Sequence, residues 1–310
     1  MSVRRVLVTG GAGFIGSNLV RDLLERGENV RVLDNFATGN RANLDGLDVE
    51  VIEGELRSYE RVHNAVRGVE TVFHLGALGS VPRSVQDPLT SSAVNIEGTL
   101  NVLLAARDEG VRRVVFSSSS SVYGTRRDLP VTEATAPDPL SPYGVAKLAA
   151  ERYCVSFSRV YHRFETVVLR YFNVFGPRQS PFSQYAAVIP RFATAIAAGQ
   201  PITIEGDGEQ SRDFTYVQNV VDATLAAADA ADVNGRIFNV SAGSPATVNE
   251  IADTIGRIVG KPVERRHEPP RPGDIRASWA DVSEARRALG YEPHIGLEDG
   301  LRRTLEALGG

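Results

Sequence analysis

Hydrophobic positions in the first half of the chain fall into two alternating kinds of segment. Short runs rich in Val, Ile, Leu and Phe stand at 4–10, 29–35, 70–77, 112–120 and 165–176. Between them, apolar residues recur at three- and four-residue spacing, which predicts helices at 16–27, 61–68, 92–110 and 141–161. This alternation predicts an α/β fold with a doubly wound parallel sheet, covered by helices on both faces.

The chain changes character after Gly176. Proline and glycine become frequent, segments such as GDGEQ and RPGD are typical of loops, and the alternation of strands and helices weakens. We therefore expect residues 1–176 to form a first domain and residues 177–310 to form mostly a second, smaller one. The strand-like segment RIFNVSA at 236–242 is expected to return to the main sheet.

Composition and charge exclude several classes of protein. The 310 residues carry a formal net charge of −4 and the arginines are scattered, so we expect no nucleic-acid partner. We find neither a signal-peptide pattern nor an uninterrupted apolar run of ~18 residues, so we expect a cytoplasmic protein without a membrane partner. Cys154 is the single cysteine and the five histidines do not pair at ligand spacing, so we expect no metal site.

A glycine-rich segment, TGGAGFIGSN, follows the first predicted strand and opens the first predicted helix. Its glycines fit G-x-G-x-x-G at Gly11, Gly13 and Gly16, and they also fit a wider spacing of Gly10, Gly13 and Gly16. Either spacing lets the backbone turn sharply and approach a pyrophosphate at a helix N-terminus, as in Rossmann folds. A tight turn that binds nothing would give the same pattern, so the surrounding strand and helix carry the interpretation.

Asp34 ends the second predicted strand, eighteen residues beyond Gly16. A carboxylate at this place accepts hydrogen bonds from the adenosine ribose hydroxyls and repels a 2′-phosphate. The predicted cofactor is therefore NAD. Arg41 is the one nearby residue that would suit NADP instead.

Tyr143 and Lys147 stand four residues apart in SPYGVAKLAAE, and the predicted helix places them on one face. Ser141 can cap this helix and Pro142 suits its first position. Only two of the 34 Lys and Arg residues are lysines, Lys147 and Lys261, which makes a chance pairing less attractive. A lysine ammonium is a compact charge with a tunable pKa, unlike a guanidinium group.

A run of serines, FSSSSSVYG, ends the predicted strand at 112–120, at the sheet edge where ligands bind. A tyrosine with a pKa near 10 is a poor base at neutral pH. A neighbouring ammonium and the positive nicotinamide ring are expected to lower the pKa of Tyr143. Tyr143 could then take a proton from a substrate hydroxyl while a hydride leaves the same carbon for NAD, with a serine hydroxyl orienting that oxygen.

These segments, together with RPGDIRASWAD, resemble the extended short-chain dehydrogenase/reductase family of the nucleotide-sugar epimerase type over nearly the whole chain. The resemblance implies three catalytic residues, Ser119, Tyr143 and Lys147. It also implies an NAD site formed by Gly10, Gly13, Phe14, Ile15, Gly16, Asp34, Asn35, Gly39, Glu55, Leu56, Leu75, Gly76, Ala77, Asn95, Ser117, Tyr143, Lys147 and Phe172. Relatives usually carry Asp-Ile in place of Glu55-Leu56, and Ala in place of Gly76.

The residues that precede the VYG segment distinguish among the reactions that this family catalyses. Dehydratases of this family carry an Asp-Glu pair there, and the related decarboxylases keep a Glu, whereas this chain has Ser120 and Ser121. Elimination without carboxylates lacks its acid and its base. The remaining chemistry is a 4-epimerisation, in which C4 of the sugar is oxidised, the ring turns over, and the hydride returns to the opposite face.

The substrate contacts that the resemblance implies are Gly79, Ser80, Ser119, Asn173, Val188, Arg212, Arg271, Asp274 and Ser278. Arg212 and Arg271 suit charge-assisted hydrogen bonds with a diphosphate. In relatives restricted to glucose and galactose a tyrosine occupies the position of Ser278, and a serine leaves room for a 2-acetamido group. The sequence therefore favours a 4-epimerase of UDP-N-acetylglucosamine that also accepts UDP-glucose.

Two other functions stay open. UDP-glucuronate 4-epimerases also carry SSSSVYG, although they usually have Thr at the position of Asn173. Some members of the superfamily bind dinucleotide without turnover and act as regulators, but this chain keeps the full catalytic set. The resemblance further implies a homodimer through the helices at 93–109 and 141–162, which carry more apolar surface than one sheet face needs.

Overall fold

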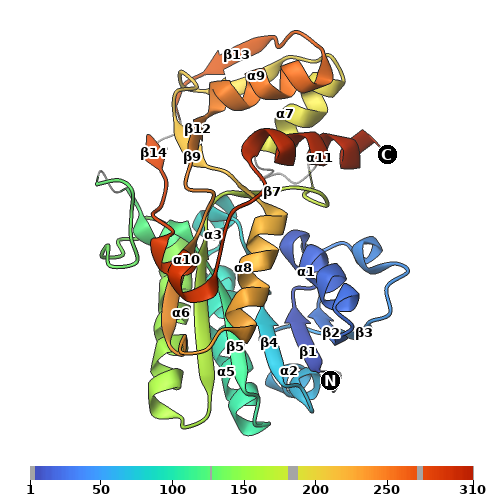
Figure 1. Ribbon diagram of the computed structural model, residues 1–310, viewed down its shortest axis with the longest axis vertical. Coiled ribbons are helices and arrows are strands. Elements are labelled where there is room, and N and C mark those ends of the chain that lie inside the picture. Colours follow the sequence, from blue (N-terminus) through green and yellow to red (C-terminus); the bar gives the residue numbers. More distant parts are fainter. Residues whose placement is uncertain (1–3, 126–127, 181–187, 271–274, 310) are drawn as a thin grey trace.

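A seven-stranded parallel sheet forms the centre of the computed structural model, which describes residues 4–125, 128–180, 188–270 and 275–309. The strands lie in the order β11-β6-β5-β4-β1-β2-β3 (Figure 1). Their bounds are β1 (Arg5–Thr9), β2 (Asn29–Asp34), β3 (Glu50–Glu53), β4 (Thr71–His74), β5 (Arg113–Ser119), β6 (Glu165–Tyr171) and β11 (Arg236–Val240). The doubly wound sheet predicted from the sequence is confirmed, and β11 pairs in parallel with β6.

The strand β3 was not predicted. It lies at the edge of the sheet, and its residues Glu50–Glu53 are mostly exposed, so it lacks the apolar run that marks the buried strands. Parallel strands that are buried on both faces read as continuous hydrophobic segments, whereas an exposed edge strand does not.

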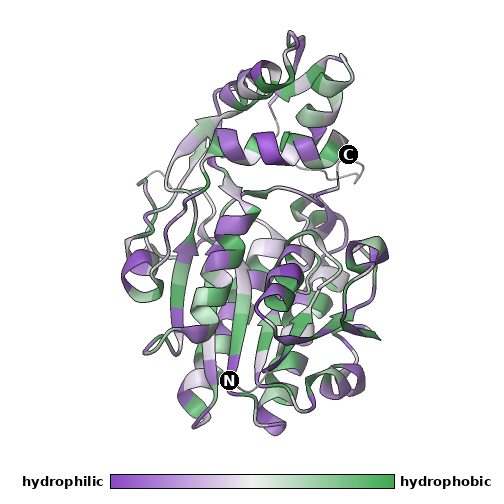
Figure 2. Cartoon of the chain, turned by 45° about the vertical axis from the view of Figure 1, so that its right-hand side comes forward, coloured by the Kyte–Doolittle hydropathy of each residue, from purple (hydrophilic) through white to green (hydrophobic). Residues whose placement is uncertain are grey.

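Helices cover both faces of the sheet. One face carries α1 (Phe14–Glu25) and α8 (Val217–Asp229), and the other carries α2 (Tyr59–Val66), α5 (Gly98–Asp108) and α6 (Pro142–Val160). Side chains alternate between the two cores, so that Val6 and Val8 of β1 pack on the side of α1 while Leu7 packs on the side of α5. Figure 2 shows the resulting hydrophobic strands, in green, in the middle of the molecule.

The helix predicted at 92–110 is interrupted. It consists of α4 (Pro88–Ser92), one π-helical turn over Ala93–Glu97, and α5, and it follows the short helix α3 (Val81–Gln86). Two 3₁₀ turns, Arg41–Leu44 and Ser120–Tyr123, complete this part of the chain.

A smaller unit covers the carboxyl ends of the strands, at the top of Figure 1. It contains the helices α7 (Val188–Ala197), α9 (Val248–Val259) and α11 (Leu297–Gly309), and the strands β8 (Ile202–Glu205), β9 (Ser211–Asp213), β12 (Pro245–Thr247), β13 (Arg265–Glu268) and β14 (Ala277–Ser278). β7 (Val174–Phe175) pairs with β10 (Thr215–Tyr216) where the chain leaves the sheet. Because α8, β11 and α10 (Ser283–Leu289) pack with the large sheet, the chain crosses between the two units more than once after residue 177.

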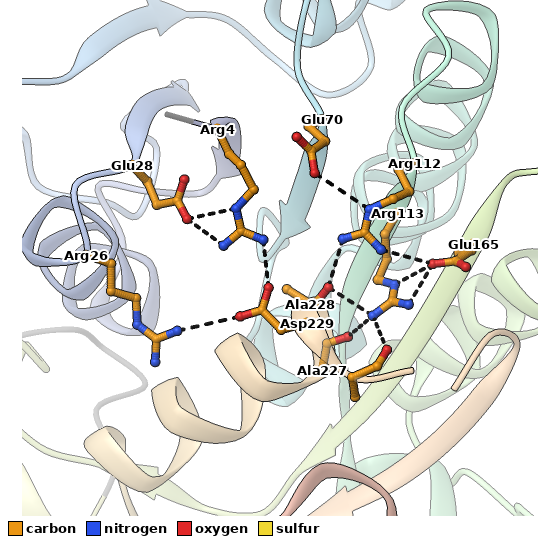
Figure 3. Close-up of polar contacts among 11 residues, drawn as sticks. Arg4, Arg26, Glu28, Glu70, Arg112, Arg113, Glu165, Ala227, Ala228 and Asp229 are labelled. Atoms are coloured by element: carbon orange, nitrogen blue, oxygen red, sulfur yellow. Dashed lines mark hydrogen bonds and ion pairs between the residues drawn. The ribbon is translucent and has the colours of Figure 1, made fainter. Parts of the chain in front are cut away.

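The side chain of a buried arginine of β5 contacts the carboxyl end of α8, near the amino ends of the strands. Arg113, which is 3% exposed, donates hydrogen bonds from Nη1 to the carbonyls of Ala227, Ala228 and Ala230 at 2.8 to 2.9 Å. Its Nε lies 2.7 Å from Oε2 of Glu165 (Figure 3). A cation at the carboxyl end of a helix hydrogen-bonds the last carbonyls and interacts favourably with the helix dipole. Arg113 therefore stabilises the packing of α8 against the sheet.

The described helices include none that is long and apolar enough to cross a lipid bilayer. Within the same residues, no group of three or more His, Cys, Asp or Glu side chains is arranged to hold a metal ion.

Candidate active site

A cavity of about 560 Å³ opens at the carboxyl ends of β1, β2, β4 and β5, in the size range of small-molecule sites. Most of the residues predicted for cofactor and sugar line this cavity, namely Gly10, Gly13, Phe14, Ile15, Gly16, Asp34, Asn35, Gly39, Glu55, Leu56, Leu75, Gly76, Ala77, Gly79, Ser80, Ser117, Tyr143 and Lys147. The parallel sheet brings these separate segments to one edge, as expected for an open α/β fold.

The glycine loop leaves no room for side chains between β1 and α1. Gly10 has a positive φ of 71°, and a Cβ placed on Gly16 would lie only 2.1 Å from the carbonyl oxygen of Gly10. Gly11 is turned away from the cavity, since its Cβ would meet Val32 at 2.7 Å. The spacing of Gly10, Gly13 and Gly16 is therefore the one that forms the cradle. A bare backbone at the N-terminus of α1 fits a pyrophosphate group.

Asp34 is buried at the end of β2, and its carboxylate accepts hydrogen bonds from the backbone N–H groups of Ala12 (2.9 Å) and Phe36 (2.8 Å). Arg41 lies 2.5 Å from Glu53 and stacks over the ring of Phe36 at 3.9 Å. Arg41 thus pairs with a carboxylate, that of Glu53. The acid and the glycine cradle together fit NAD.

Leu56 and Gly76, where the sequence analysis noted a departure from the usual family pattern, lie next to each other. A Cβ on Gly76 would lie 3.0 Å from Cδ1 of Leu56 and 3.1 Å from Oγ1 of Thr9. The leucine side chain thus occupies the space that an alanine methyl group would need. Glu55 is exposed and pairs with Arg57 at 2.5 Å.

The catalytic set predicted from the sequence meets at the start of α6. The Nζ atom of Lys147 donates to the carbonyl of Ser117 at 2.8 Å, and the Ser119 hydroxyl lies near enough to Tyr143 to influence the pKa of its phenol. The backbone N–H of Tyr143 donates to Oγ of Ser84 at 3.1 Å, so α3 fixes the first turn of α6. Three segments that are distant in sequence hold these side chains together.

Burial has the largest effect on the pKa values of Tyr143 and Lys147. It raises the pKa of Tyr143 to about 12, against the opposing effect of the Ser119 hydrogen bond, and it lowers the pKa of Lys147 to about 8. The Lys147 Nζ atom lies 5.9 Å from the Tyr143 ring centroid. The prediction that the pKa of Tyr143 is lowered is therefore wrong for the protein's own groups, because burial outweighs the one opposing contribution, that of Ser119. The lowering would have to come from the positive charge of an oxidised nicotinamide.

His74 is a buried residue of the site that sequence analysis missed. Its ring lies 2.7 Å from Oγ1 of Thr9 and 3.0 Å from Oγ1 of Thr99, and burial lowers its pKa to about 3. Oγ1 of Thr9 also accepts the N–H of Gly76 at 3.0 Å. The neutral imidazole thus fixes the loop that follows β4. Only the fold brings these segments together, so no local sequence signal was available.

Asn95 and Phe172, both predicted cofactor residues, do not line the cavity. Asn95 is buried, and its side-chain amide bonds the backbone N–H and carbonyl of Leu78 at 2.9 and 3.2 Å, so it shapes the loop that does line it. The side chain of Phe172 is fully buried and packs with Val122 and Tyr123.

Several predicted sugar contacts lie apart from this cavity. Asn173 has a φ of 33° and donates to the carbonyl of Asp213 at 3.2 Å. Val188 begins α7, and Ser278 of β14 lies opposite Arg212 of β9 in the strand pairing. Arg271 and Asp274 lie outside the described residues.

Arg83 also lines the cavity but was not predicted. It follows Gly79 and Ser80 in the first turn of α3, where Oγ of Ser80 accepts the Arg83 N–H at 3.2 Å. It stands in the same LGSVPRS stretch that pointed to Gly79 and Ser80. Leu33, Thr38 and Gln179 are among the other lining residues and carry no local signal of their own.

Known proteins similar to this chain share the chemistry that the site suggests. A model described as the NAD dependent epimerase/dehydratase family matches residues 6–241. A UDP-glucose 4-epimerase of Mycolicibacterium smegmatis is 38% identical over 312 residues, 97% of each chain. The structure of a UDP-N-acetylglucosamine 4-epimerase from Methanobrevibacter ruminantium, in complex with UDP-N-acetylmuramic acid, has a TM-score of 0.94 at 38% identity over 99% of each chain.

A third similar protein bears on the cofactor. The UDP-glucose 4-epimerase of Thermus thermophilus, solved in complex with NAD, has a TM-score of 0.91 at 38% identity, again over 99% of each chain. The resemblance inferred from the sequence motifs and the predicted cofactor, NAD, are both confirmed.

Proposed function

Since this chain belongs to the NAD dependent epimerase/dehydratase family, we propose that it interconverts UDP-sugars that differ in configuration at C4. The observation that carries this proposal is the meeting of Ser119, Tyr143 and Lys147 beside the cavity that the glycine cradle and Asp34 line. When bound, NAD accepts a hydride from C4 of the sugar and gives it back.

The side chains of the protein manage the proton. Tyr143 takes the proton of the C4 hydroxyl and returns it after the ring has turned over. The ammonium of Lys147 favours the phenolate form of Tyr143 through its positive charge. Ser119 orients the reacting oxygen, since its hydroxyl acts on the same Tyr143 phenol that takes the proton.

The residues after Ser119 support epimerisation over elimination. Ser120 and Ser121 open the 3₁₀ turn at the end of β5, and the Ser119 hydroxyl donates to Oγ of Ser121 at 3.1 Å. A dehydration across C5 and C6 needs an acid and a base at these positions, and two hydroxyls supply neither at neutral pH.

We further propose UDP-N-acetylglucosamine as a substrate, together with UDP-glucose. Ser278 is a small, half-buried residue of β14, and its neighbour across the strand pair is Arg212, a candidate for the diphosphate. A serine in place of a tyrosine leaves volume for a 2-acetamido group.

The test is direct. The purified protein is incubated separately with UDP-N-acetylglucosamine, UDP-glucose and UDP-glucuronate, with and without added NAD, and the sugar anomeric proton is followed by NMR. Conversion of the first to its galacto form supports the proposal. Conversion of UDP-glucuronate alone would support the rival uronate epimerase, and no conversion of any sugar would favour a dinucleotide-binding regulator.

Ser278→Tyr examines the specificity. The bulky side chain should lower kcat/KM for UDP-N-acetylglucosamine by about tenfold or more while leaving UDP-glucose conversion intact, because one misfitted group in a pocket changes binding by ~1–3 kcal/mol. Ser278→Ala is the matched control, since it removes the hydroxyl without adding volume, and it should accept both sugars. Equal effects of Ser278→Tyr on both sugars would contradict this role.

We also propose that the protein is a homodimer. Large apolar side chains stay exposed along α4 and α6, with Leu89 at 84%, Val145 at 52% and Val160 at 62%. Val145 and Val160 lie in the helix predicted at 141–162, and Leu89 lies just before the helix predicted at 93–109, so an isologous pairing would cover them. Sedimentation equilibrium should give twice the chain mass, and Val145→Glu should give a monomer.

A further inference from the structure

We propose that Glu151, which no sequence motif singled out, is a positioning residue for the catalytic set. The inference rests on the proposed function, because it concerns the same site. The carboxylate of Glu151 ties the end of β5 to the helix that carries Tyr143 and Lys147, and it supplies the negative charge beside the Lys147 ammonium.

Glu151 lies on α6 one turn after Lys147 and two turns after Tyr143, so the three side chains share a helix face. Its side chain is fully buried. Oε1 accepts a hydrogen bond from Oγ of Ser118 at 2.5 Å. The contact therefore joins the catalytic helix to the carboxyl end of β5.

The position of Ser118 in the strand explains how this contact can affect the catalytic residues. Ser118 stands between Ser117, whose carbonyl accepts a hydrogen bond from the Lys147 ammonium at 2.8 Å, and Ser119, whose hydroxyl influences the pKa of Tyr143. Successive residues of a strand point to opposite faces, so the middle serine reaches into the core while its neighbours face the site. Anchoring Ser118 sets the position of both neighbours relative to α6.

A buried arginine holds the carboxylate in place. Nε and Nη2 of Arg170, which is 1% exposed, donate to the two oxygens of Glu151 at 2.9 and 2.8 Å. Nη1 of Arg170 reaches the hydroxyl of Tyr123 at 2.8 Å, and that hydroxyl donates to Oδ1 of Asn239 at 2.7 Å. The network thus spans β6, β11 and the turn after β5.

Such a network is not explained by stability alone. A buried ion pair repays its own desolvation only in part, and well-packed apolar residues of similar volume are often as stable. A fully satisfied polar network fixes one geometry among its members instead. Here the fixed geometry is that of the strand end and the catalytic helix.

The charge of Glu151 acts on Lys147 in a second way. The groups that face the ammonium are the Ser117 carbonyl and the Phe116 ring of β5, His74 of β4, and Tyr143, Glu151 and Cys154 of α6. His74 stays neutral because burial lowers its pKa to about 3, and burial raises the pKa of the Cys154 thiol, which stays neutral as well. Glu151 is then the one described anion that favours the charged form of Lys147.

Glu151→Gln separates these roles from a merely structural one, because the amide keeps the size of the side chain and an acceptor for Ser118 but loses the charge. The expected result is a kcat lowered about tenfold with KM unchanged. The alkaline limb of the kcat profile, set by deprotonation of Lys147 near pH 8, should move down by about one pH unit.

Glu165→Gln is the matched control. It removes a carboxylate from another buried arginine, Arg113, at the amino end of the same sheet (Figure 3). It should reduce stability without moving the pH profile. Ser118→Ala tests the tether without touching the charge, and it decides the matter if Glu151→Gln does not fold. It should lower kcat about fivefold and leave the alkaline limb in place.

An unmoved limb in folded Glu151→Gln, or a wild-type kcat in Ser118→Ala, would overturn the inference. A wild-type protein that epimerises no UDP-sugar would refute the proposed function instead, so the two failures are distinguishable.

Discussion

Gly16→Ala tests the cradle on which cofactor binding depends. A Cβ at this position would lie 2.1 Å from the Gly10 carbonyl oxygen and 2.9 Å from Cα of Gly11. Real Cβ atoms essentially never approach another heavy atom within 3.0 Å, so the loop and α1 must separate by about 0.9 Å. The obstructing atoms belong to the backbone and cannot rotate away as a side chain would.

The size of the effect follows from this displacement. Overpacking of this kind lowers the free energy of unfolding by ~1–3 kcal/mol. Binding should suffer more, because the shift would misalign backbone N–H groups at the N-terminus of α1 that would face a bound diphosphate. The loss of two such hydrogen bonds to a charged group, each worth ~1.5 kcal/mol, sets the scale. The loss of about 3 kcal/mol corresponds to a Kd for NAD raised about a hundredfold.

The assay is calorimetric titration of NAD into protein stripped of cofactor, with circular dichroism to show that the variant is folded. Gly296→Ala serves as the control, because its Cβ would meet no atom within 4 Å and its φ lies outside the left-handed region. The control should bind NAD as the wild type does. A Gly16→Ala protein whose Kd stays within about threefold of the wild type, less than 1 kcal/mol, would refute the role of close backbone approach.

Three further outcomes are expected. Tyr143→Phe should lower turnover about a thousandfold while the Kd for NAD is unchanged, because only the proton-transfer group is removed, and retained turnover would exclude Tyr143 as the base. In the wild type, kcat should fall as the pH rises above about 8, since burial lowers the pKa of Lys147 to about 8 and the ammonium is lost above it. A flat profile between pH 7 and 10 would contradict that role for Lys147. Arg113→Met should lower the free energy of unfolding, measured in urea titrations, by about 3 kcal/mol, because the last carbonyls of α8 and the Glu165 carboxylate lose a buried partner. A change below about 1 kcal/mol, the size of an exposed ion pair, would refute this role of Arg113.

The sequence by itself determined the features that depend on spacing along the chain. The alternation of apolar runs predicted the parallel sheet, and the i, i+4 spacing placed Tyr143 and Lys147 on one face of a helix. The glycines after the first strand and the acid at the end of the second predicted NAD. Each of these follows from the repeat of a helix or a strand, which is the same in every protein.

Only the tertiary structure decided the features that join distant segments. It selected Gly10 over Gly11 for the cradle, placed α8 with the large sheet, and brought Glu151 of α6 against Ser118 of β5. It also reversed the predicted direction of the Tyr143 pKa, because desolvation depends on everything packed around a group. Local spacing is set by backbone geometry. Burial depends on residues that are far apart in sequence and come together only in the folded chain.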